Sequence, residues 1–367
     1  MVVAKFGGSS LAGAREYKRV AEIVHKNKIP IVVVSAPGGK VKITDLLIAA
    51  VSRWRRSGKV DGEIFDAICD RFIGITRPLG VRVDTYLADI KAAINAGCGY
   101  DYAVSRGEYL SARILAEVMG YNFVDAKECI KLTASGAIDM RSIRAHIGAV
   151  KAPCVIPGFY GKLPGGAIRL LPRGGSDLSG AAIAAALNAM YQKWTDVDGI
   201  FDGHGGVMQN ISYDEAELIC YFGATVVHYE AMKLLKNAGV SLTVKNTFTD
   251  SCGTVISKKR HDGWAFSSKN MYLGGNEAAN HEAEILGGGL KIPLRIEALG
   301  NKKILIDGCG FSSLALKRIL CYDGIDEVTV TAAIGNIPSD FMPQNRLVTI
   351  DSGSIFYCRV SDKLTLT

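Results

Sequence analysis

The chain has 367 residues, of which 48% are hydrophobic and 22% are charged. This length predicts two domains, and the hydrophobic content argues against a disordered chain. No apolar run is long enough for a membrane span, the first residues lack a signal-peptide pattern, and the net charge of +7 is carried by scattered basic residues, which argues against a role in binding nucleic acid.

Nine cysteines and six histidines are dispersed along the chain. The number of cysteines is odd and no two stand in a C-x-x-C pair, so neither a disulfide framework nor a structural zinc site is expected. The pattern predicts a reducing, cytoplasmic setting in which thiols serve as small core residues. No metal-binding constellation is predicted.

The first predicted element is a strand at residues 2–6, followed at once by Gly7-Gly8-Ser9. A helix is predicted from about Ala14 to Lys26, with apolar side chains on one face. A strand, a glycine loop and a helix in this order can hold a phosphate group, and Lys5 at the edge of the loop can reach a transferring phosphoryl group. The spacing is not that of a P-loop, and an ordinary surface turn is the alternative.

A near-continuous apolar run at residues 29–35 predicts a buried strand of a parallel sheet, whose carboxyl end is where ligands bind in open α/β sheets. The next helix is predicted to begin at Thr44, which either caps it or presents its hydroxyl to a substrate. Residues 61–97 are predicted to be helical and peripheral. Glu108 and the glycine before it are expected to interrupt a helix that runs to about Met119. The Glu108 carboxylate either compensates the helix dipole or holds an ammonium group.

Further strands are predicted at residues 122–125, 153–157 and 167–171. The last leads into Arg173-Gly174-Gly175-Ser176-Asp177, after which a helix of small apolar residues is predicted. Backbone N–H groups and the positive end of the dipole point out of a helix N-terminus, and an arginine offers a planar fork to a carboxylate or phosphate. The segment therefore predicts an anion site, in which Asp177 either caps the helix or acts on a ligand; an ordinary capped turn is the alternative.

Two aspartates, Asp196 and Asp198, follow the predicted strand that contains Trp194. They are either turn formers or ligands of a nucleotide or its Mg²⁺. A later strand is predicted at residues 240–247, and Lys245 near its end is a candidate base or phosphate contact.

The composition changes near Gly263, and the remainder of the chain has predicted strands of its own at residues 303–307, 327–330 and 346–350, with a helix at 312–320 between the first two. This order predicts a β-α-β unit in a separate small domain. No convergent polar cluster is found there, which favours regulation or assembly over chemistry.

The order of these motifs resembles the aspartokinases, which belong to the amino acid kinase superfamily, over roughly residues 2–256. The resemblance rests on segments that are common singly but specific in this order. They are Lys5-Phe6-Gly7-Gly8-Ser9-Ser10, Val34-Ser35-Ala36, Thr44-Asp45, Gly107-Glu108, Arg173-Gly174-Gly175-Ser176-Asp177, Thr195-Asp196-Val197-Asp198-Gly199, Ser212-Tyr213, Gly223-Ala224 and Val244-Lys245-Asn246-Thr247-Phe248.

The resemblance implies an α/β fold, a three-layer α/β/α sandwich around a mostly parallel sheet, as a catalytic domain at residues 1–260. A small, divergent ACT-like α+β domain for regulation or assembly is implied at residues 265–367. The implied reaction is transfer of the ATP γ-phosphoryl group to the β-carboxylate of L-aspartate, the first step toward lysine, threonine and methionine. The cofactors would be ATP and Mg²⁺, and the partners small molecules and a second copy of the chain, with neither nucleic acid nor membrane.

Residue roles follow from the same resemblance. Lys5 would neutralise charge on the transferring phosphoryl group and Asp177 would orient Lys5. The residues implied to bind aspartate are Thr44, Glu108, Arg173, Gly174, Gly175 and Ser176. The residues implied to bind the nucleotide are Lys5, Phe6, Gly7, Gly8, Ser9, Thr195, Asp196, Asp198, Phe201 and Lys245. Because a carboxylate is already a nucleophile at pH 7, positioning and charge neutralisation suffice without a His or Cys catalyst.

The chain departs from the family pattern at four places. Asp202-Gly203-His204 stands where the family has Asp-Pro-Arg, whose arginine helps to bind the ATP phosphates; His228-Tyr229-Glu230 replaces His-Pro-Arg; Arg106 replaces a histidine; and Ser35-Ala36 is followed by an unusual Pro37-Gly38-Gly39. These departures leave two alternatives open: a related amino acid kinase with a different acceptor, and a non-catalytic amino-acid-sensing subunit. Inhibition by lysine or threonine is also left open.

Overall fold

The computed structural model describes residues 1–149, 152–172, 174–221, 226–259, 261–275, 295–298, 303–307, 326–335 and 357–361. The chain divides into two compact units: one comprises Met1–Ile200, Val207–Tyr213 and Val226–Lys259, and the other comprises Phe201–Gly206, Asp214–Thr225 and Arg260–Thr367. Among the described residues, no helix has the length and apolar character that a membrane span requires.

The first unit is built on an eight-stranded sheet with the order β3-β4-β2-β1-β7-β9-β10-β8. Its strands are β1 (Val2–Phe6), β2 (Ile31–Val34), β3 (Asn122–Phe123), β4 (Cys154–Pro157), β7 (Met190–Thr195), β8 (Asn210–Ser212), β9 (Leu242–Asn246) and β10 (Thr254–Ser257). Every neighbouring pair is parallel apart from β9 and β10. The carboxyl ends of β1, β2, β7 and β9 therefore meet at one edge of the sheet, which is where ligands bind in such folds.

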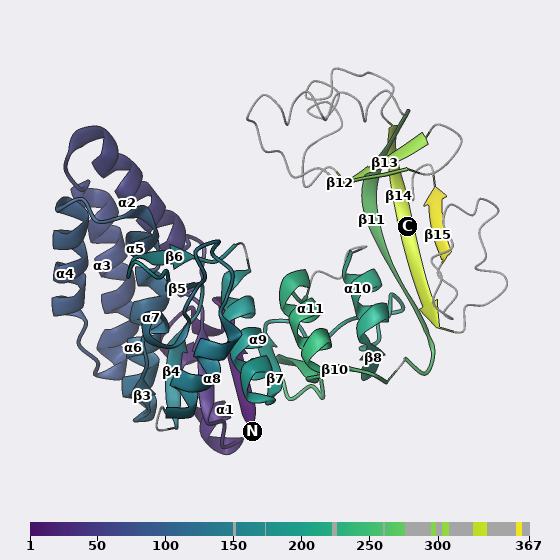
Figure 1. Ribbon diagram of the computed structural model, residues 1–367, viewed down its shortest axis with the longest axis horizontal. Helices are drawn as coiled ribbons and strands as arrows, with labels where there is room; N and C mark the ends of the chain where they lie inside the picture. The colour runs from purple at the N-terminus through teal and green to yellow at the C-terminus, as the bar shows by residue number, and fades with distance from the viewer. Residues whose placement is uncertain are drawn as a thin grey trace. The chain divides into compact units, whose positions relative to one another are not determined.

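Helices cover both faces of this sheet (Figure 1). They are α1 (Ala14–Lys26), α2 (Ile43–Ser57), α3 (Gly62–Thr76), α4 (Asp84–Asn95), α5 (Tyr100–Val104), α6 (Arg106–Met119), α7 (Ala126–Cys129), α8 (Met140–Ala149), α9 (Gly175–Leu187) and α11 (Tyr229–Ala238); α10 (Tyr213–Tyr221) follows β8. On one face, α9 lies against β1, β2 and β7 and is covered by α8 and α11; on the other, α6 lies against β2, β3 and β4 beside α1. The predicted three-layer sandwich is confirmed.

Successive side chains of β1 point to opposite faces of the sheet, and therefore to different helix layers. Phe6 stacks on Trp194 with ring centroids 5.6 Å apart and belongs to the apolar core shared with α1 and α6. Lys5, as the neighbour of Phe6, points to the opposite face, toward α9. There Gly180 brings α9 close, because a Cβ at this position would lie 2.7 Å from Tyr191 and 3.3 Å from Lys5 Cβ. The close approach places the beginning of α9 beside Lys5.

Most predicted elements of the first unit are confirmed, with three differences. Helix α2 begins at Ile43 with Lys42 as its N-cap, so Thr44 lies inside the first turn and does not cap the helix. The break before α6 lies at Ser105, so Glu108 belongs to the first turn rather than interrupting the helix. The strand predicted at residues 167–171 is β6 (Ile168–Leu170), which pairs with β5 (Tyr160–Lys162) in a hairpin outside the central sheet.

The second unit contains a five-stranded antiparallel sheet with the order β12-β13-β11-β14-β15. Its strands are β11 (Trp264–Gly275), β12 (Arg295–Ala298), β13 (Lys303–Asp307), β14 (Asp326–Gly335) and β15 (Tyr357–Ser361). Strands β13 and β14 flank β11 and are parallel to each other, as a β-α-β unit requires. The strands predicted at 303–307 and 327–330 are confirmed; the helix predicted at 312–320 and the strand at 346–350 lie outside the described residues.

Candidate active site

A buried ion cluster lies where β1, β7 and α9 meet. Lys5 Nζ is 2.6 Å from Asp177 Oδ1, and Lys193 Nζ donates a hydrogen bond to Asp177 Oδ2. The three side chains, in the order Lys5, Asp177 and Lys193, are 8%, 7% and 12% exposed. Lys5 and Lys193 are partners in the parallel register of β1 and β7, so both point to the same face of the sheet. Two ammonium groups share one carboxylate, and the cluster is therefore suited to an anion.

Asp177 lies in the first turn of α9, and its side chain makes no capping hydrogen bond. Burial opposes its ionisation, but the charges of Lys5 and Lys193 outweigh burial and hold the pKa of this carboxyl well below its usual range. Asp177 is thus an ionised partner of the two lysines. The capping role considered from the sequence is wrong.

Glu108 is a second buried carboxyl group near this cluster. Burial raises its pKa to about 7, against the lowering effects of backbone N–H groups, including that of Ala36, and of the Lys5 and Arg106 charges. Its Oε2 is buried and has no hydrogen-bond partner among the described residues. A buried carboxylate oxygen without a partner is costly unless a ligand supplies a donor. The side chain therefore fits a cationic group of a substrate.

The glycine loop after β1 is held by a second glycine loop after β2. Gly38 N donates to Gly8 O at 2.8 Å. The two backbones are in such close contact that a Cβ at Gly38 would lie 2.6 Å from the carbonyl carbon of Gly8. Arg71 of α3 fixes the second loop from outside, because its Nη2 donates to Gly38 O and to Ala12 O at 2.5 Å each. The helices predicted to be peripheral therefore reach the site through Arg71.

Gly38→Ala is expected to displace the Gly8 backbone, because no Cβ fits at this distance. We expect kcat/KM for the nucleotide to fall roughly 10²-fold, the effect that a shift of about 1 Å in a positioning group produces. The matched control is Gly74→Ala in α3, where a Cβ meets no atom within 4 Å. Steady-state kinetics check the prediction, and a Gly38→Ala enzyme as active as Gly74→Ala would contradict it.

The turn before α9 is shaped by Gly174, which has φ 79° and is the N-cap of the helix. A Cβ there would lie 2.1 Å from Cδ2 of His228, so the His228 ring occupies the space beside the turn. Ser176 is buried, and Gly158 contacts it closely from the end of β4. Arg173, which was predicted to bind an anion at this turn, lies outside the described residues.

The loop after β7 is fixed by hydrogen bonds from the end of β9. Asn246 Nδ2 and Thr249 Oγ1 donate to Asp198 Oδ1 at 2.8 and 2.5 Å. The hydrogen bonds from Thr249 and Asn246 lower the pKa of the Asp198 carboxyl. Thr195 Oγ1 donates to Asp196 Oδ1 at 3.0 Å. Asp198 thus shapes the loop, and Asp196 remains on the exposed side of it.

Lys245, which was predicted to bind the nucleotide, lies apart from the Lys5 cluster. Lys245 packs over the Trp194 ring at 5.5 Å, and because Trp194 shares a face with Phe6, Lys245 lies on the face of the sheet opposite Lys5. It cannot join the cluster directly, although the loop that follows it reaches the same edge. Phe201 belongs to the second unit and is 44% exposed.

Sequence reasoning missed Lys193 and the setting of Arg106. A lysine within the strand sequence Gln192-Lys193-Trp194 is the signal for the first, but its meaning needs the register with β1. Arg106, beside Glu108 in the chain, is buried with its guanidinium 4.3 Å from the ring of Tyr102 and 4.5 Å from the ring of Tyr109. The rings stabilise its cation, and it also donates hydrogen bonds to the Tyr102 carbonyl oxygen and to Ser105 Oγ.

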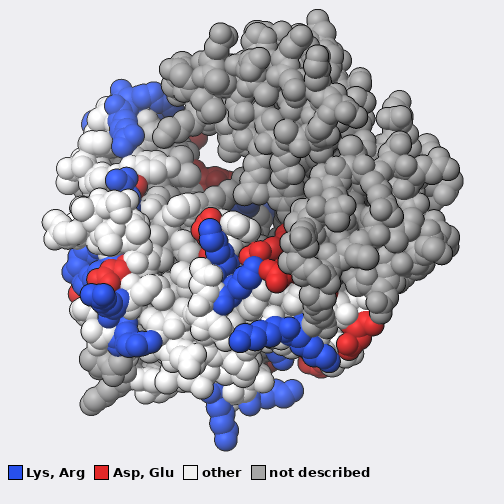
Figure 2. Space-filling model, turned by 45° about the vertical axis from the view of Figure 1, so that its right-hand side comes forward, with Lys and Arg blue, Asp and Glu red and all other residues white. Residues whose placement is uncertain are grey.

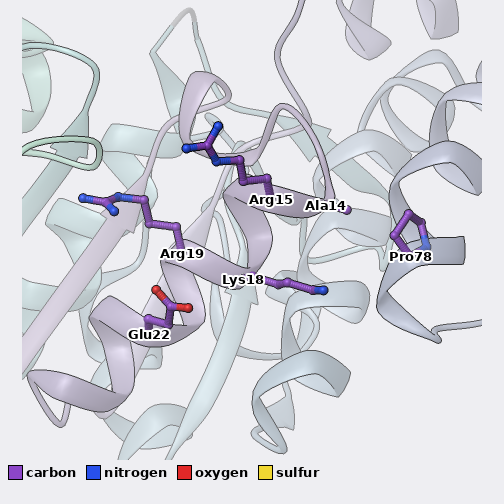
Figure 3. A pocket seen from close by; sticks show the side chains of 6 residues that line it. All are labelled: Ala14, Arg15, Lys18, Arg19, Glu22 and Pro78. Atoms are coloured by element: carbon purple, nitrogen blue, oxygen red, sulfur yellow. The ribbon is translucent and has the colours of Figure 1, made fainter.

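A cavity of about 440 Å³ lies between α1 and the turn Arg77–Leu79, but Lys18 points toward Pro78 while Arg15 and Arg19 point away from it (Figure 3). On the face shown in Figure 2, Lys and Arg side chains are dispersed, several of them beside Asp or Glu. Among the described residues, no group of three or more His, Cys, Asp or Glu side chains is placed to hold a metal ion.

Residues 1–246 match the family model described as "Amino acid kinase family". The chain belongs to the amino acid kinase family. Among curated relatives, Aspartokinase 3 of Bacillus subtilis is 29% identical over 297 residues, which are 71% of this chain and 64% of the relative. Aspartokinase 1, chloroplastic, of Arabidopsis thaliana is 30% identical over 299 residues, 70% of this chain and 52% of the relative. The chain thus spans less than two thirds of these relatives.

Solved structures of aspartate kinases resemble the chain over nearly its whole length. Aspartate kinase of Clostridium acetobutylicum, described as an allosteric enzyme, has a TM-score of 0.80 and 27% identity and covers 98% of this chain and 96% of its own. E. coli aspartokinase III in complex with aspartate and ADP has a TM-score of 0.70 at 20% identity, with the same coverage. The second likeness shows the fold alone. The fold expected for an amino acid kinase is therefore present.

Proposed function

We propose that the chain is an ATP-dependent aspartate kinase, which transfers the γ-phosphoryl group of ATP to the β-carboxylate of L-aspartate. The observation that carries the proposal is the cluster of Lys5, Asp177 and Lys193. Glu108 lies close enough for the Lys5 charge to oppose part of the rise in the Glu108 pKa that burial causes. Likeness to the Clostridium acetobutylicum aspartate kinase over 98% of this chain supports the choice of acceptor.

Phosphoryl transfer to a carboxylate needs two anions held in line while their repulsion is cancelled. In the proposed complex, the net positive cluster meets the transferring phosphoryl group, and the backbones of Gly7, Gly8 and Ser9 cradle it. Glu108 Oε2 accepts a hydrogen bond from the ammonium group of aspartate. Arg173 binds one of its carboxylates beside Ser176 and the Gly174–Gly175 turn, and Thr44 contributes its hydroxyl.

The nucleotide is proposed to lie over the loops that follow β7 and β9, in contact with Thr195, Asp196 and Lys245. Magnesium is usually held by substrate phosphates with one or two carboxylates rather than by a cage of protein ligands. The exposed Asp196 fits that arrangement, since Asp198 Oδ1 already accepts two hydrogen bonds. Mg²⁺ bound with ATP would neutralise phosphate charge. Asp196 would orient it, and Asp198 would keep the loop in place.

The remaining expectations are part of the same proposal. A catalytic domain at residues 1–260 and a regulatory or assembly domain at 265–367 are proposed, with a homodimer or larger assembly formed through the latter. A reducing, cytoplasmic setting is proposed because Cys69, Cys98, Cys129, Cys154 and Cys252, among the described cysteines, are free thiols.

The test is hydroxylamine trapping of the acyl phosphate, with L-aspartate and MgATP as substrates and coupled release of ADP as the second readout. The proposal predicts aspartate-dependent formation of a hydroxamate. Glutamate and N-acetylglutamate in parallel reactions test for a different acceptor. If no amino acid yields a hydroxamate, the chain is not a kinase of this kind; if only another acceptor yields one, aspartate is the wrong substrate.

The ionisation of Glu108 predicts how aspartate use depends on pH. The Glu108 carboxyl must be ionised to hold an ammonium group, and burial raises its pKa to about 7 in the free protein. We therefore expect kcat/KM for aspartate to fall about tenfold for each pH unit below 7 and to level off above it. The KM for ATP is expected to change little. In Glu108→Gln, kcat/KM for aspartate is expected to be low and to be the same at every pH in this range. A flat wild-type profile between pH 5.5 and 8 would contradict the assignment.

A further inference from the structure

We propose that Lys193 is a positioning residue for phosphoryl transfer: it holds Asp177 in place, so that the Lys5 ammonium group can move from Asp177 to the transferring phosphoryl group. The inference rests on the proposed function and names a residue that the family motifs quoted above do not contain. It follows from the geometry of the buried Lys5 and Asp177 with the half-buried Lys193, and from the cost of leaving a buried charge without a partner.

The two lysines hold Asp177 in different ways. Lys193 Nζ makes an aligned hydrogen bond with Oδ2. Lys5 Nζ lies 2.6 Å from Oδ1, yet this oxygen is buried and receives no aligned hydrogen bond. The Lys193 contact is therefore the directional one, and the Lys5 contact is a close approach of charges. Lys5 can therefore leave the carboxylate without breaking an aligned hydrogen bond, whereas Lys193 cannot.

The charge balance gives the second reason. One lysine is enough to neutralise Asp177, and burying a second ammonium group costs desolvation energy that a purely structural ion pair does not require. The surplus charge lies beside the glycine loop after β1, where an anion is expected to bind. If Lys5 were the only partner, its move toward a phosphoryl group would leave a buried carboxylate unpaired and facing an incoming anion. With Lys193 in place, Asp177 stays neutralised throughout.

The strand register explains why Lys193 can do this. Lys5 and Lys193 are direct partners on adjacent parallel strands, and their side chains leave the same face of the sheet on either side of Asp177. Tyr191, two residues before Lys193 on the same face, is fully buried and directs its hydroxyl at the Asp177 carbonyl oxygen at 3.3 Å. Strand β7 and the first turn of α9 are thus joined at two points, and the Lys193 ammonium group has a defined position.

The kinetic test compares Lys193→Met, which keeps the length of the side chain and removes its charge, with Lys193→Arg, which keeps the charge. The matched control is Lys26→Met at the exposed end of α1. We expect Lys193→Met to lower kcat roughly 10²-fold, the effect of losing one electrostatic group that acts in the transition state, with KM for aspartate changed less than about threefold. Lys193→Arg is expected to recover part of kcat. A Lys193→Met enzyme with the kcat of Lys26→Met would overturn the inference.

A binding measurement separates this inference from the choice of acceptor. The γ-phosphate of the non-hydrolysable analogue AMP-PNP is expected to meet the cluster, whereas ADP lacks that group. By calorimetry, Lys193→Met is expected to reduce the preference for AMP-PNP over ADP about tenfold, the loss of one charge-assisted contact, and to leave ADP binding unchanged. In an Asp177→Asn background the same substitution is expected to add little, because Lys193 acts through Asp177.

The outcomes are distinguishable. If the wild-type protein prefers AMP-PNP but phosphorylates no aspartate, the proposed function fails while the inference about Lys193 is supported by the lost preference in Lys193→Met. If Lys193→Met retains the full preference, or if its effect persists undiminished in the Asp177→Asn background, the positioning role is refuted. Circular dichroism and thermal unfolding of each variant show whether the comparison is made between folded proteins.

Discussion

Lys5→Met is expected to lower kcat with aspartate by roughly 10³-fold, while KM for aspartate changes less than about threefold. The reason is that the Lys5 ammonium group, 2.6 Å from Asp177 in the free protein, gains its strongest interaction only when charge develops on the transferring phosphoryl group. An interaction that is stronger in the transition state than in the ground state appears in kcat rather than in substrate affinity.

Steady-state kinetics with aspartate as the varied substrate measure this effect, and Lys26→Met serves as the control for removal of one positive charge. Equal losses in kcat and in aspartate affinity would mean that Lys5 binds the substrate rather than the transition state. Methionine is preferred to alanine at this position because it fills the space below α9, which Gly180 allows to approach Lys5 closely.

Asp177→Asn is expected to lower the free energy of unfolding by about 3–5 kcal/mol, because the substitution leaves the buried Lys5 and the half-buried Lys193 without a counter-charge. Since the folded-state pKa of Asp177 is held well below its usual range, the wild-type stabilisation is present at every pH above the unfolded-state pKa and is lost only in strong acid. The difference between the two proteins is therefore expected to stay constant from pH 5 to pH 8.

Urea unfolding monitored by circular dichroism at several pH values measures this difference. Asp89→Asn on the exposed face of α4 is the control and is expected to change stability by less than about 0.5 kcal/mol. A difference of less than about 1 kcal/mol for Asp177→Asn would show that the carboxylate does not hold the two lysines together.

The parts of the site that are contiguous in sequence were predictable from it. A short apolar strand that ends in Lys5 and runs into Gly7-Gly8-Ser9 before an amphipathic helix has a recognisable local pattern, and the predicted bounds at residues 2–6 and 14–26 are confirmed. Asp177 was likewise placed at the beginning of a helix. In each case the local pattern and the tertiary structure favour the same conformation.

The parts that depend on strand register or on distant contacts were not predictable. Lys193 becomes meaningful only because β7 pairs with β1, and Lys245 lies on the opposite face because its register partner is Trp194. Arg71 lies in a helix whose own sequence shows no sign of the loop that it holds. Thr44 has the residue type of an N-cap, but tertiary contacts let α2 begin one residue earlier, at Ile43, which packs against Gly107.

The central claim is that phosphoryl transfer takes place at the cluster of Lys5, Asp177 and Lys193, with Glu108 holding the acceptor. The most direct measurement is a crystal structure of the protein with AMP-PNP, Mg²⁺ and L-aspartate. The account predicts the γ-phosphate within hydrogen-bond distance of Lys5 Nζ, and the aspartate ammonium group on Glu108 Oε2 with its β-carboxylate in line with that phosphate. A triphosphate bound away from Lys5, or an aspartate whose ammonium group does not meet Glu108, would contradict it.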